Sequence, residues 1–265
     1  MEQHTLREIK KTILQMVHKA DVSHVGAALS IVDIIYTLYS KVANISKENV
    51  NDRNRDVIVL SKGHSSAALY STLYHLGYLD KSQIDNYSID SGSLPCHIDK
   101  EKSPFFEVST GSLGHGASIA TGMALAKKMD KLDGQVYVIC GDGECNEGSV
   151  WEAIMFAATK KINNLTMIID YNKLQAFGKT NDVIDQSNLA ERFKVFGFDT
   201  KEIDGHNFDE ITSALKYRSD KPIAIIAHTI KGKGVSFMEN RLEWHYKSPN
   251  AEQLKLATAE IEEKY

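Results

Sequence analysis

The chain alternates short strand-like runs with helix-like segments, and this alternation limits its fold more than any other feature. Most of the runs are continuously apolar rather than alternating with polar residues. Continuous apolar strands separated by helices are typical of a parallel sheet that is covered on both faces. We therefore expect an α/β fold built on a parallel β-sheet with helices on both faces. The expected strands are 56–60, 135–140, 165–170, 199–203 and 223–228.

Helical segments fill the intervals between these strands. Residues 6–18 place apolar side chains on one helical stripe, whereas 31–39 is too apolar for a surface helix and should be buried in the core or under a partner. The polar stretch 173–187 is interpreted as a loop. Because no repeat, low-complexity tract or Pro/Ser-rich linker interrupts residues 1–265, we expect a single domain. Further helices are expected at 117–131, 149–161, 189–195, 208–216 and 251–263.

Bulk properties exclude several classes of protein. With 265 residues, a formal net charge of −4 and scattered basic residues, the chain has no general attraction to nucleic acid or to an anionic membrane. Its 3 cysteines form no CxxC pair, which suits a reducing cytosol better than a disulfide framework. Residues 1–20 lack the apolar core of a signal peptide, and no apolar run approaches the length of a membrane helix. We expect a cytoplasmic protein.

Polar residues follow two of the expected strands. The Gly-Asp-Gly sequence with Asp142 at its centre follows the run 136–140, and Asn172 follows the run 165–170. In open α/β sheets the carboxyl ends of the strands bind ligands, and oxygen ligands there suit a hard cation such as Mg²⁺ or Ca²⁺. The backbone N–H of Gly143, at the start of the next helix, would favour a phosphate group. Taken singly, Asp142 and Asn172 could also be ordinary turn residues.

Other phosphate-binding patterns fit poorly. Gly141, Gly143 and Gly148 do not have the GxGxxG spacing of a dinucleotide fold, and the glycines of 110–116 follow a polar loop rather than a strand. No GK[ST] sequence of a P-loop occurs. The glycine segments therefore do not indicate a nicotinamide enzyme or a P-loop NTPase.

The GDG…N pattern and its surroundings resemble the transketolase family, which uses thiamine diphosphate. The resemblance extends over about 21–250, nearly the whole chain, and its motifs occur in the family's order. They are SHVG at 23–26, SKGH at 61–64, LPCH at 94–97, TGSLGHG at 110–116, GDG at 141–143 with Asn172, KGKG at 231–234 and WH at 244–245.

The resemblance implies a role for each matching residue. Asp142, Asn172 and the backbone carbonyl of Leu174 would bind the metal. His24 and His97 would hydrogen-bond the ketose hydroxyls, and imidazole suits this work because it donates or accepts near neutral pH. His245 is expected beside the reactive face of the cofactor and is grouped with these catalytic residues. The expected cofactor-binding residues are His64, Gly111, Ser112, Leu113, Gly143, Glu147, Lys231 and His245.

Two of these positions carry a second interpretation. Glu147 corresponds to a glutamate buried at the family's dimer interface, and it could equally be a carboxylate that stabilises a helix N-terminus. Lys231 matches a lysine that neutralises the diphosphate, although its sequence could also form an exposed basic turn. His115 replaces a glutamine of the family and is more simply a surface residue.

The resemblance also implies a partner. In transketolases a second domain supplies the glutamate that activates the pyrimidine ring and the arginines that grip a sugar phosphate. This sequence ends at Tyr265 without such a domain. It therefore resembles the N-terminal half of a split transketolase, which would transfer a two-carbon ketol unit only with a complementary C-terminal subunit, in an α₂β₂ heterotetramer.

The residues on either side of His24 and His97, the two histidines expected to hydrogen-bond the ketose, depart from the family pattern. Residues 22–26 read VSHVG where SGHPG is usual, and 96–98 read CHI where GHP is usual. Loss of Pro frees φ and replacement of Gly adds a Cβ, so the sugar or sugar phosphate is expected to differ from the ordinary pentose-pathway substrates. Alternatives are a subunit of a 1-deoxyxylulose-phosphate synthase or 2-oxo-acid dehydrogenase type, or a cofactor-binding subunit without catalysis.

Overall fold

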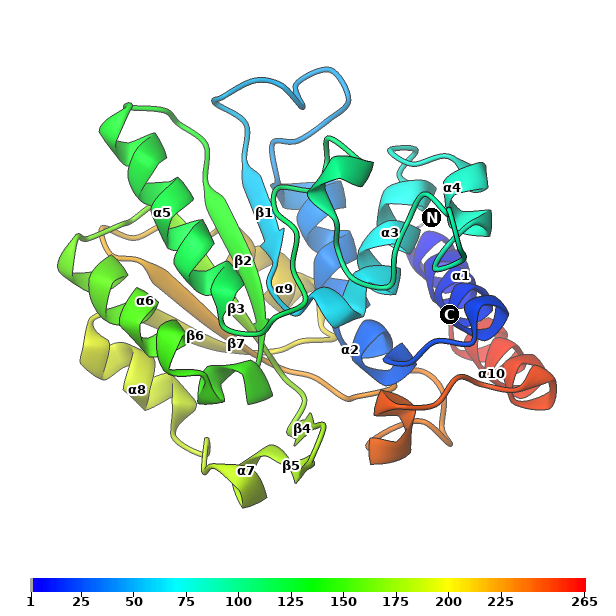
Figure 1. Cartoon of the computed structure of the whole chain (residues 1–265). Helices are drawn as coiled ribbons and strands as arrows, with labels where there is room; N and C mark the ends of the chain where they lie inside the picture. Colours follow the sequence, from blue (N-terminus) through cyan, green and yellow to red (C-terminus); the bar gives the residue numbers. More distant parts are fainter. Residues whose placement is uncertain (1) are drawn as a thin grey trace.

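The computed structural model describes residues 2–265 and is built on a five-stranded sheet (Figure 1). All neighbouring strands in this sheet are parallel, and their order is β1-β2-β3-β7-β6. The predicted α/β fold with a parallel sheet is confirmed. The strands are β1 (Val57–Leu60), β2 (Val136–Gly141), β3 (Leu165–Tyr171), β7 (Ile223–His228) and β6 (Asp199–Asp204).

Helices cover both faces of the sheet. Alternate residues of a strand point to opposite faces, and in every strand except β6 the side chains on both faces are mostly apolar and need to be covered. Tyr137 and Ile139 belong to the core on one side, whereas Val138 and Cys140 belong to the core on the other. The first side carries α2 (Val25–Thr37) and α9 (Phe208–Lys216), with α1 (Glu2–Ala20), α3 (Ser66–His75), α4 (Lys81–Asp85) and α10 (Ala251–Lys264) packed outside α2 (Figure 1). The second side carries α5 (His115–Met129), α6 (Gly148–Thr159) and α8 (Leu189–Phe196).

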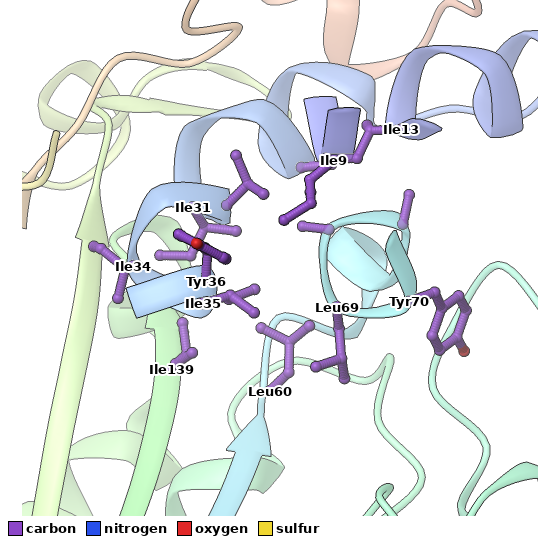
Figure 2. Packing of buried hydrophobic residues seen from close by; sticks show 14 of the residues in the cluster. Ile9, Ile13, Ile31, Ile34, Ile35, Tyr36, Leu60, Leu69, Tyr70 and Ile139 are labelled. Carbon is purple, nitrogen blue, oxygen red and sulfur yellow. The ribbon is translucent and has the colours of Figure 1, made fainter. Parts of the chain in front are cut away.

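Helix α2 forms the centre of the larger core. Its residues are buried throughout, and it continues into a π-helical turn at Leu38–Val42. Figure 2 shows Ile35 of this helix beside Leu60 of β1, with Ile139 of β2 close by, and all three belong to the same core cluster as Ile31 and Ile34. The stretch 31–39 is therefore buried by this chain alone, without the partner that the sequence left open.

The helix that contains this stretch corrects the expectation that no apolar run approaches the length of a membrane helix. Val25–Val42 is long and apolar enough to cross a membrane by length and composition, although no run of this kind was expected. Because 83% of that segment is buried inside the fold, it is accounted for as the core helix.

The loop expected at 173–187 contains short elements. Strands β4 (Leu174–Gln175) and β5 (Gly178–Lys179) form an antiparallel hairpin, and helix α7 (Thr180–Val183) follows. These elements are too short and polar to show a period in the sequence. The remaining predicted helices and strands are present within a few residues of their expected bounds.

The register of β2 and β3 places the residues that follow these two strands, Asp142 and Asn172, side by side. Gly141 pairs with Asp170, so that Asp142 and Asn172 leave the sheet at the same edge. The predicted convergence of a carboxylate and a carboxamide at neighbouring strand ends is confirmed.

Candidate functional site

A cavity of about 390 Å³ opens at the carboxyl ends of β1, β2 and β3. It lies where open α/β sheets bind ligands. Most of the residues predicted for the site line it: His24, His64, His97, Gly111, Leu113, Asp142, Gly143, Glu147, Asn172, Leu174, Lys231 and His245.

Ser112 does not line the cavity and is exposed, as is His115. Both belong to a segment whose other residues, Gly111 and Leu113, do form the cavity wall. Glu147 lines the cavity but is exposed in the single chain, so its expected burial at an interface stays a prediction.

The Asp142 carboxylate is 2% exposed and accepts several hydrogen bonds. Its Oδ1 accepts from the backbone N–H of Gly143 at 2.8 Å, and its Oδ2 accepts from Lys173 N at 2.7 Å and Thr180 Oγ1 at 3.0 Å. Burial, followed by the negative charge of Asp170, raises the pKa of Asp142. A buried carboxylate whose charge is penalised in this way gains from a nearby cation.

Asn172 is oriented by its neighbour Asp170. Its Nδ2 donates to Asp170 Oδ2 at 3.1 Å, which directs its Oδ1 away from that carboxylate. Oδ1 accepts from Leu174 N at 3.0 Å. The Asp142 carboxylate, the Asn172 amide oxygen and the Leu174 carbonyl thus form a set of hard oxygen donors, which fits a divalent cation such as Mg²⁺.

Protein side chains alone would leave such a cation incompletely coordinated. No group of three or more His, Cys, Asp and Glu residues within the described 2–265 could hold a metal. Mg²⁺ is usually bound by one or two carboxylates together with the phosphates of its substrate. The donor set around Asp142 therefore fits a cation that is shared with a phosphate group.

Lys231 brings an unneutralised ammonium group to the cavity. It is 1% exposed, and its Nζ lies 3.0 Å from the Leu174 carbonyl oxygen and 2.9 Å from His245 Nδ1. Among the described residues no carboxylate forms a salt bridge with it. Burial and then the positive charge of Lys62 lower the pKa of Lys231 to about 8. This environment favours an anion as ligand.

Four histidine rings gather on one wall of the cavity. The ring of His24 lies 5.1 Å from that of His64, 5.9 Å from that of His97 and 4.9 Å from that of His245, between centroids. Burial and then the charge of His97 lower the pKa of His24 to about 4, and burial and then Lys231 lower the pKa of His245 to about 3. Neutral imidazoles at neutral pH can each donate and accept one hydrogen bond.

Close backbone contacts shape this wall. A Cβ on Gly111 would lie 3.0 Å from Cδ2 of His97, and a Cβ on Gly143 would lie 2.7 Å from Cβ of Gln175. His24 itself has a φ of 76°, a left-handed conformation that is uncommon outside glycine. Backbone strain of this kind clusters at functional sites.

Several cavity residues were not predicted from the sequence. Lys62 binds the fully buried carboxylate of Asp170, which also accepts from Ser30 Oγ at 2.5 Å. The only sequence signal for Lys62 is its place beside His64. The other residues of the cavity wall that were missed include Glu144, Asn146, Gln175, Phe177, Val183 and Ile184.

Comparison with known proteins decides the family. Residues 1–261 match the family model described as transketolase, thiamine diphosphate binding domain. The chain belongs to this family. The resemblance inferred from the motifs is thereby confirmed, and thiamine diphosphate is the cofactor for which this domain is named.

Two relatives of similar length are named as subunits of transketolases. The chain is 41% identical over 263 residues to a 6-deoxy-6-sulfo-D-fructose transketolase subunit from Clostridium sp. (strain MSTE9), covering 98% of this chain and 96% of that one. It is 39% identical over 258 residues to an apulose-4-phosphate transketolase subunit from Phocaeicola vulgatus, covering 96% and 92%.

In longer transketolases, a region similar to this chain forms one part of the protein. Human transketolase is 34% identical over 247 residues, covering 92% of this chain and 39% of that one. The crystal structure of transketolase from Campylobacter jejuni superposes with a TM-score of 0.89 at 33% identity, covering 98% of this chain and 42% of that one. The chain thus spans about two fifths of these proteins.

Proposed function

We propose that this transketolase-family domain is the N-terminal subunit of a split transketolase, active only with a complementary C-terminal subunit. The observation that carries this proposal is that two relatives matched over almost their whole length are named as transketolase subunits. The chain covers nearly all of two relatives named as subunits and only 39% of human transketolase. An α₂β₂ heterotetramer in the cytoplasm is the assembly we propose.

Within this subunit, Asp142, Asn172 and the Leu174 carbonyl would hold Mg²⁺ or Ca²⁺ against the diphosphate, and Lys231 would neutralise the remaining negative charge. The support is the donor set described above and the buried ammonium group that lacks a carboxylate partner among the described residues. When bound, thiamine diphosphate supplies the carbon centre for ketol transfer, and the protein supplies orientation and hydrogen bonds.

The histidines would position the sugar. His24 and His97 face the cavity as neutral imidazoles and would hydrogen-bond hydroxyls of a ketose, and His245 would lie beside the reacting group. Their pKa values lie below that of ordinary histidine chiefly because of burial. A neutral ring can accept a hydrogen bond from one hydroxyl and donate one to another, and it can take up a proton, which suits cleavage of a bond next to a hydroxyl-bearing carbon.

The substrate would be a ketose or its phosphate as donor and an aldose as acceptor, outside the ordinary pentose-pathway pair. Two observations support this. The flanks of His24 and His97 depart from the usual SGHPG and GHP sequences, and the relatives at 41% and 39% identity are named for 6-deoxy-6-sulfo-D-fructose and apulose 4-phosphate.

Reconstitution tests the proposal. The chain is assayed for ketol transfer alone and with the complementary subunit from the same organism, using 6-deoxy-6-sulfofructose, apulose 4-phosphate and xylulose 5-phosphate as donors. We expect turnover only from the pair, and substantial turnover by the single chain would reject the split enzyme. A kcat/KM of roughly 10⁴ M⁻¹s⁻¹ or more with xylulose 5-phosphate and ribose 5-phosphate would reject the specialised substrate.

Calorimetry of the pair tests the metal site separately. Asp142→Ala should abolish thiamine diphosphate binding because the diphosphate would enter the cavity without its cation. Asp133→Ala, which changes an exposed aspartate outside the cavity, is the matched control. Unchanged affinity in Asp142→Ala would show that the metal assignment is wrong.

A further inference from the structure

Glu144 is a buried carboxylate for which the proposed chemistry has no role. It lies in the turn after β2 and is 1% exposed. Its Oε1 accepts hydrogen bonds from Ser61 Oγ and from the backbone N–H of Gly114, the latter at 2.9 Å. Its Oε2 accepts from the backbone N–H of Gly141 at 3.1 Å. One side chain thus joins three segments that are far apart in the sequence.

Each of the three segments carries part of the cavity wall. The segment of Ser61 continues into Lys62 and His64, that of Gly114 is preceded by Gly111 and Leu113, and that of Gly141 continues into Asp142. Glu144 lines the cavity as well. Its carboxylate is therefore the junction of the walls proposed to hold the cofactor.

Glycines let these segments approach closely enough for one carboxylate to reach all of them. A Cβ on Gly116 would lie 2.3 Å from Ser61 Oγ, and a Cβ on Gly63 would lie 2.5 Å from the carbonyl oxygen of Thr110. Real Cβ atoms do not approach other atoms so closely. The segment of Ser61 and the segment of Gly114 can therefore contact each other only because Gly63 and Gly116 have no side chain. Glu144 then fastens them to the end of β2.

The geometry at this junction suits a carboxylate. All three partners point donors at Glu144, and a carboxylate is the side chain that only accepts. Hydrogen bonds to an ionised acceptor are roughly twice as strong as neutral ones.

We propose that Glu144 is a positioning residue that fixes the three walls of the cofactor cavity relative to one another. Its value for the enzyme rests on the proposed function, because the walls matter through the cofactor they hold. The contact itself does not depend on that function and can be tested in the chain alone.

Glu144→Gln is the decisive variant because it keeps the shape and replaces one acceptor oxygen by a donor. At least one of the three N–H or O–H groups would then meet another donor. Glu107→Gln is the matched control, since Glu107 is an 11% exposed glutamate paired with Arg55 at 2.5 Å outside the cavity. Amide hydrogen exchange is followed in the single chain, and thiamine diphosphate affinity is measured in the assembled pair.

We expect Glu144→Gln to accelerate exchange at Gly114 and Gly141 about tenfold, with exchange in β6 and β7 unchanged, and to weaken cofactor binding about tenfold. Glu107→Gln should change neither. Unchanged exchange at both glycines would overturn the proposal, and so would an equal acceleration throughout the sheet, which would mean that Glu144 only stabilises the fold.

A second variant keeps the test decisive if Glu144→Gln does not fold. Ser61→Ala removes one donor and leaves the two backbone bonds, so we expect about threefold weaker cofactor binding, a factor set by one lost hydrogen bond. Ser71→Ala, at a buried serine whose Oγ lies 3.2 Å from Met16 Sδ, is its control. Equal affinities in the two serine variants would contradict the proposal. Failure of the wild-type pair to bind thiamine diphosphate would instead count against the proposed function, and the exchange result would still decide the role of Glu144.

Discussion

Two buried lysines in different regions of the molecule show how a structural charge differs from one available to a ligand. Lys10 of α1 is 0% exposed, and Lys231 in the cavity is 1% exposed. Lys10 Nζ lies 2.9 Å from Asp33 Oδ1, and the other oxygen of Asp33 lies 2.6 Å from His206 Nδ1. Lys231 Nζ contacts a carbonyl oxygen and an imidazole nitrogen instead.

The pKa shifts of the two lysines have opposite signs. Burial lowers the pKa of Lys10, but Asp33 and Tyr265 together more than compensate, and the net pKa is raised. For Lys231, burial and the charge of Lys62 together outweigh the opposite effect of the Asp142 and Asp170 charges, and the pKa falls to about 8. A buried charge with a partner is part of the fold. A buried ammonium group without a carboxylate in contact favours a bound anion instead. The contrast between Lys10 and Lys231 can be tested by substituting each of them.

The largest effect is expected from Lys10→Met, on folding. Removal of Lys10 leaves the buried Asp33 carboxylate with His206 as its remaining partner. Breaking a buried ion pair in this way costs about 3–5 kcal/mol of the free energy of unfolding. Urea unfolding measures this loss. Lys11→Met in the same helix is the control, because its pair with Glu262 is partly exposed and such pairs contribute about 0–1 kcal/mol. Similar losses in both variants would remove the distinction between Lys10 and an ordinary surface lysine.

Lys231→Met is expected to have the converse effect. Loss of a charge-assisted contact should weaken thiamine diphosphate binding in the assembled pair by about 1.5–3 kcal/mol. The free energy of unfolding should fall less than in Lys10→Met, because the contacts with Leu174 and His245 are lost but no ion pair is broken. Lys233→Met changes a neighbouring lysine that does not line the cavity. A destabilised Lys231→Met variant with normal cofactor affinity would make Lys231 a structural residue like Lys10.

Most of the sheet could be predicted from the sequence, because all of its strands except β6 are apolar runs that end next to glycine or polar residues. Segments 208–216 and 223–228 were predicted with the bounds that α9 and β7 have. The strand order β1-β2-β3-β7-β6 could not be derived, since it depends on how the helices pack across the sheet. The hairpin and helix within 174–183 could not be predicted, because elements of so few residues show no periodic pattern of apolar side chains.

The site divides in a similar way. Asp142 and Asn172 were found because strand ends and motif spacing are visible along the sequence. Lys62, Glu144 and Asp170 acquire their importance from burial and from contacts with distant segments, and neither property leaves a local pattern. Ser112 stays a prediction: its motif matches the family, but its side chain does not line the cavity of the single chain, because a motif does not determine which side chains of a loop face the cavity.

The cavity should also respond to acid more than the region of Lys10. His24 and His245 have folded pKa values of about 4 and about 3, below the ordinary 6.5. As the pH falls, these histidines take up protons in the unfolded chain before they do so in the folded chain. Their contribution to the free energy of unfolding is therefore fully present above about pH 6.5 and is lost as the pH falls toward 4. Both rings are partly accessible, so we expect a combined loss of only about 1–2 kcal/mol between pH 7 and 5.

Chemical unfolding at several pH values measures this loss. His24→Gln should flatten part of the pH dependence, while His4→Gln, at an exposed histidine of α1, should leave it unchanged. The difference between the two variants isolates His24 from the cavity carboxylates, whose raised pKa values act in the opposite direction. Parallel profiles would contradict the idea that burial keeps His24 neutral.

The smallest effect is expected at the residues of 110–116 that point away from the cavity. Ser112 and His115 are exposed, and the His115 ring contacts only the carbonyl of Leu113, at 3.1 Å, among the contacts described for it. Ser112→Ala and His115→Gln should therefore change cofactor affinity and unfolding free energy by less than about 0.5 kcal/mol, as surface substitutions usually do. Leu113→Ala on the same segment should weaken cofactor binding measurably, since Leu113 lines the cavity. A large loss of affinity in Ser112→Ala would mean that this segment turns its other face to the cofactor in the assembled enzyme, and that the wall described for the single chain is not the one that binds.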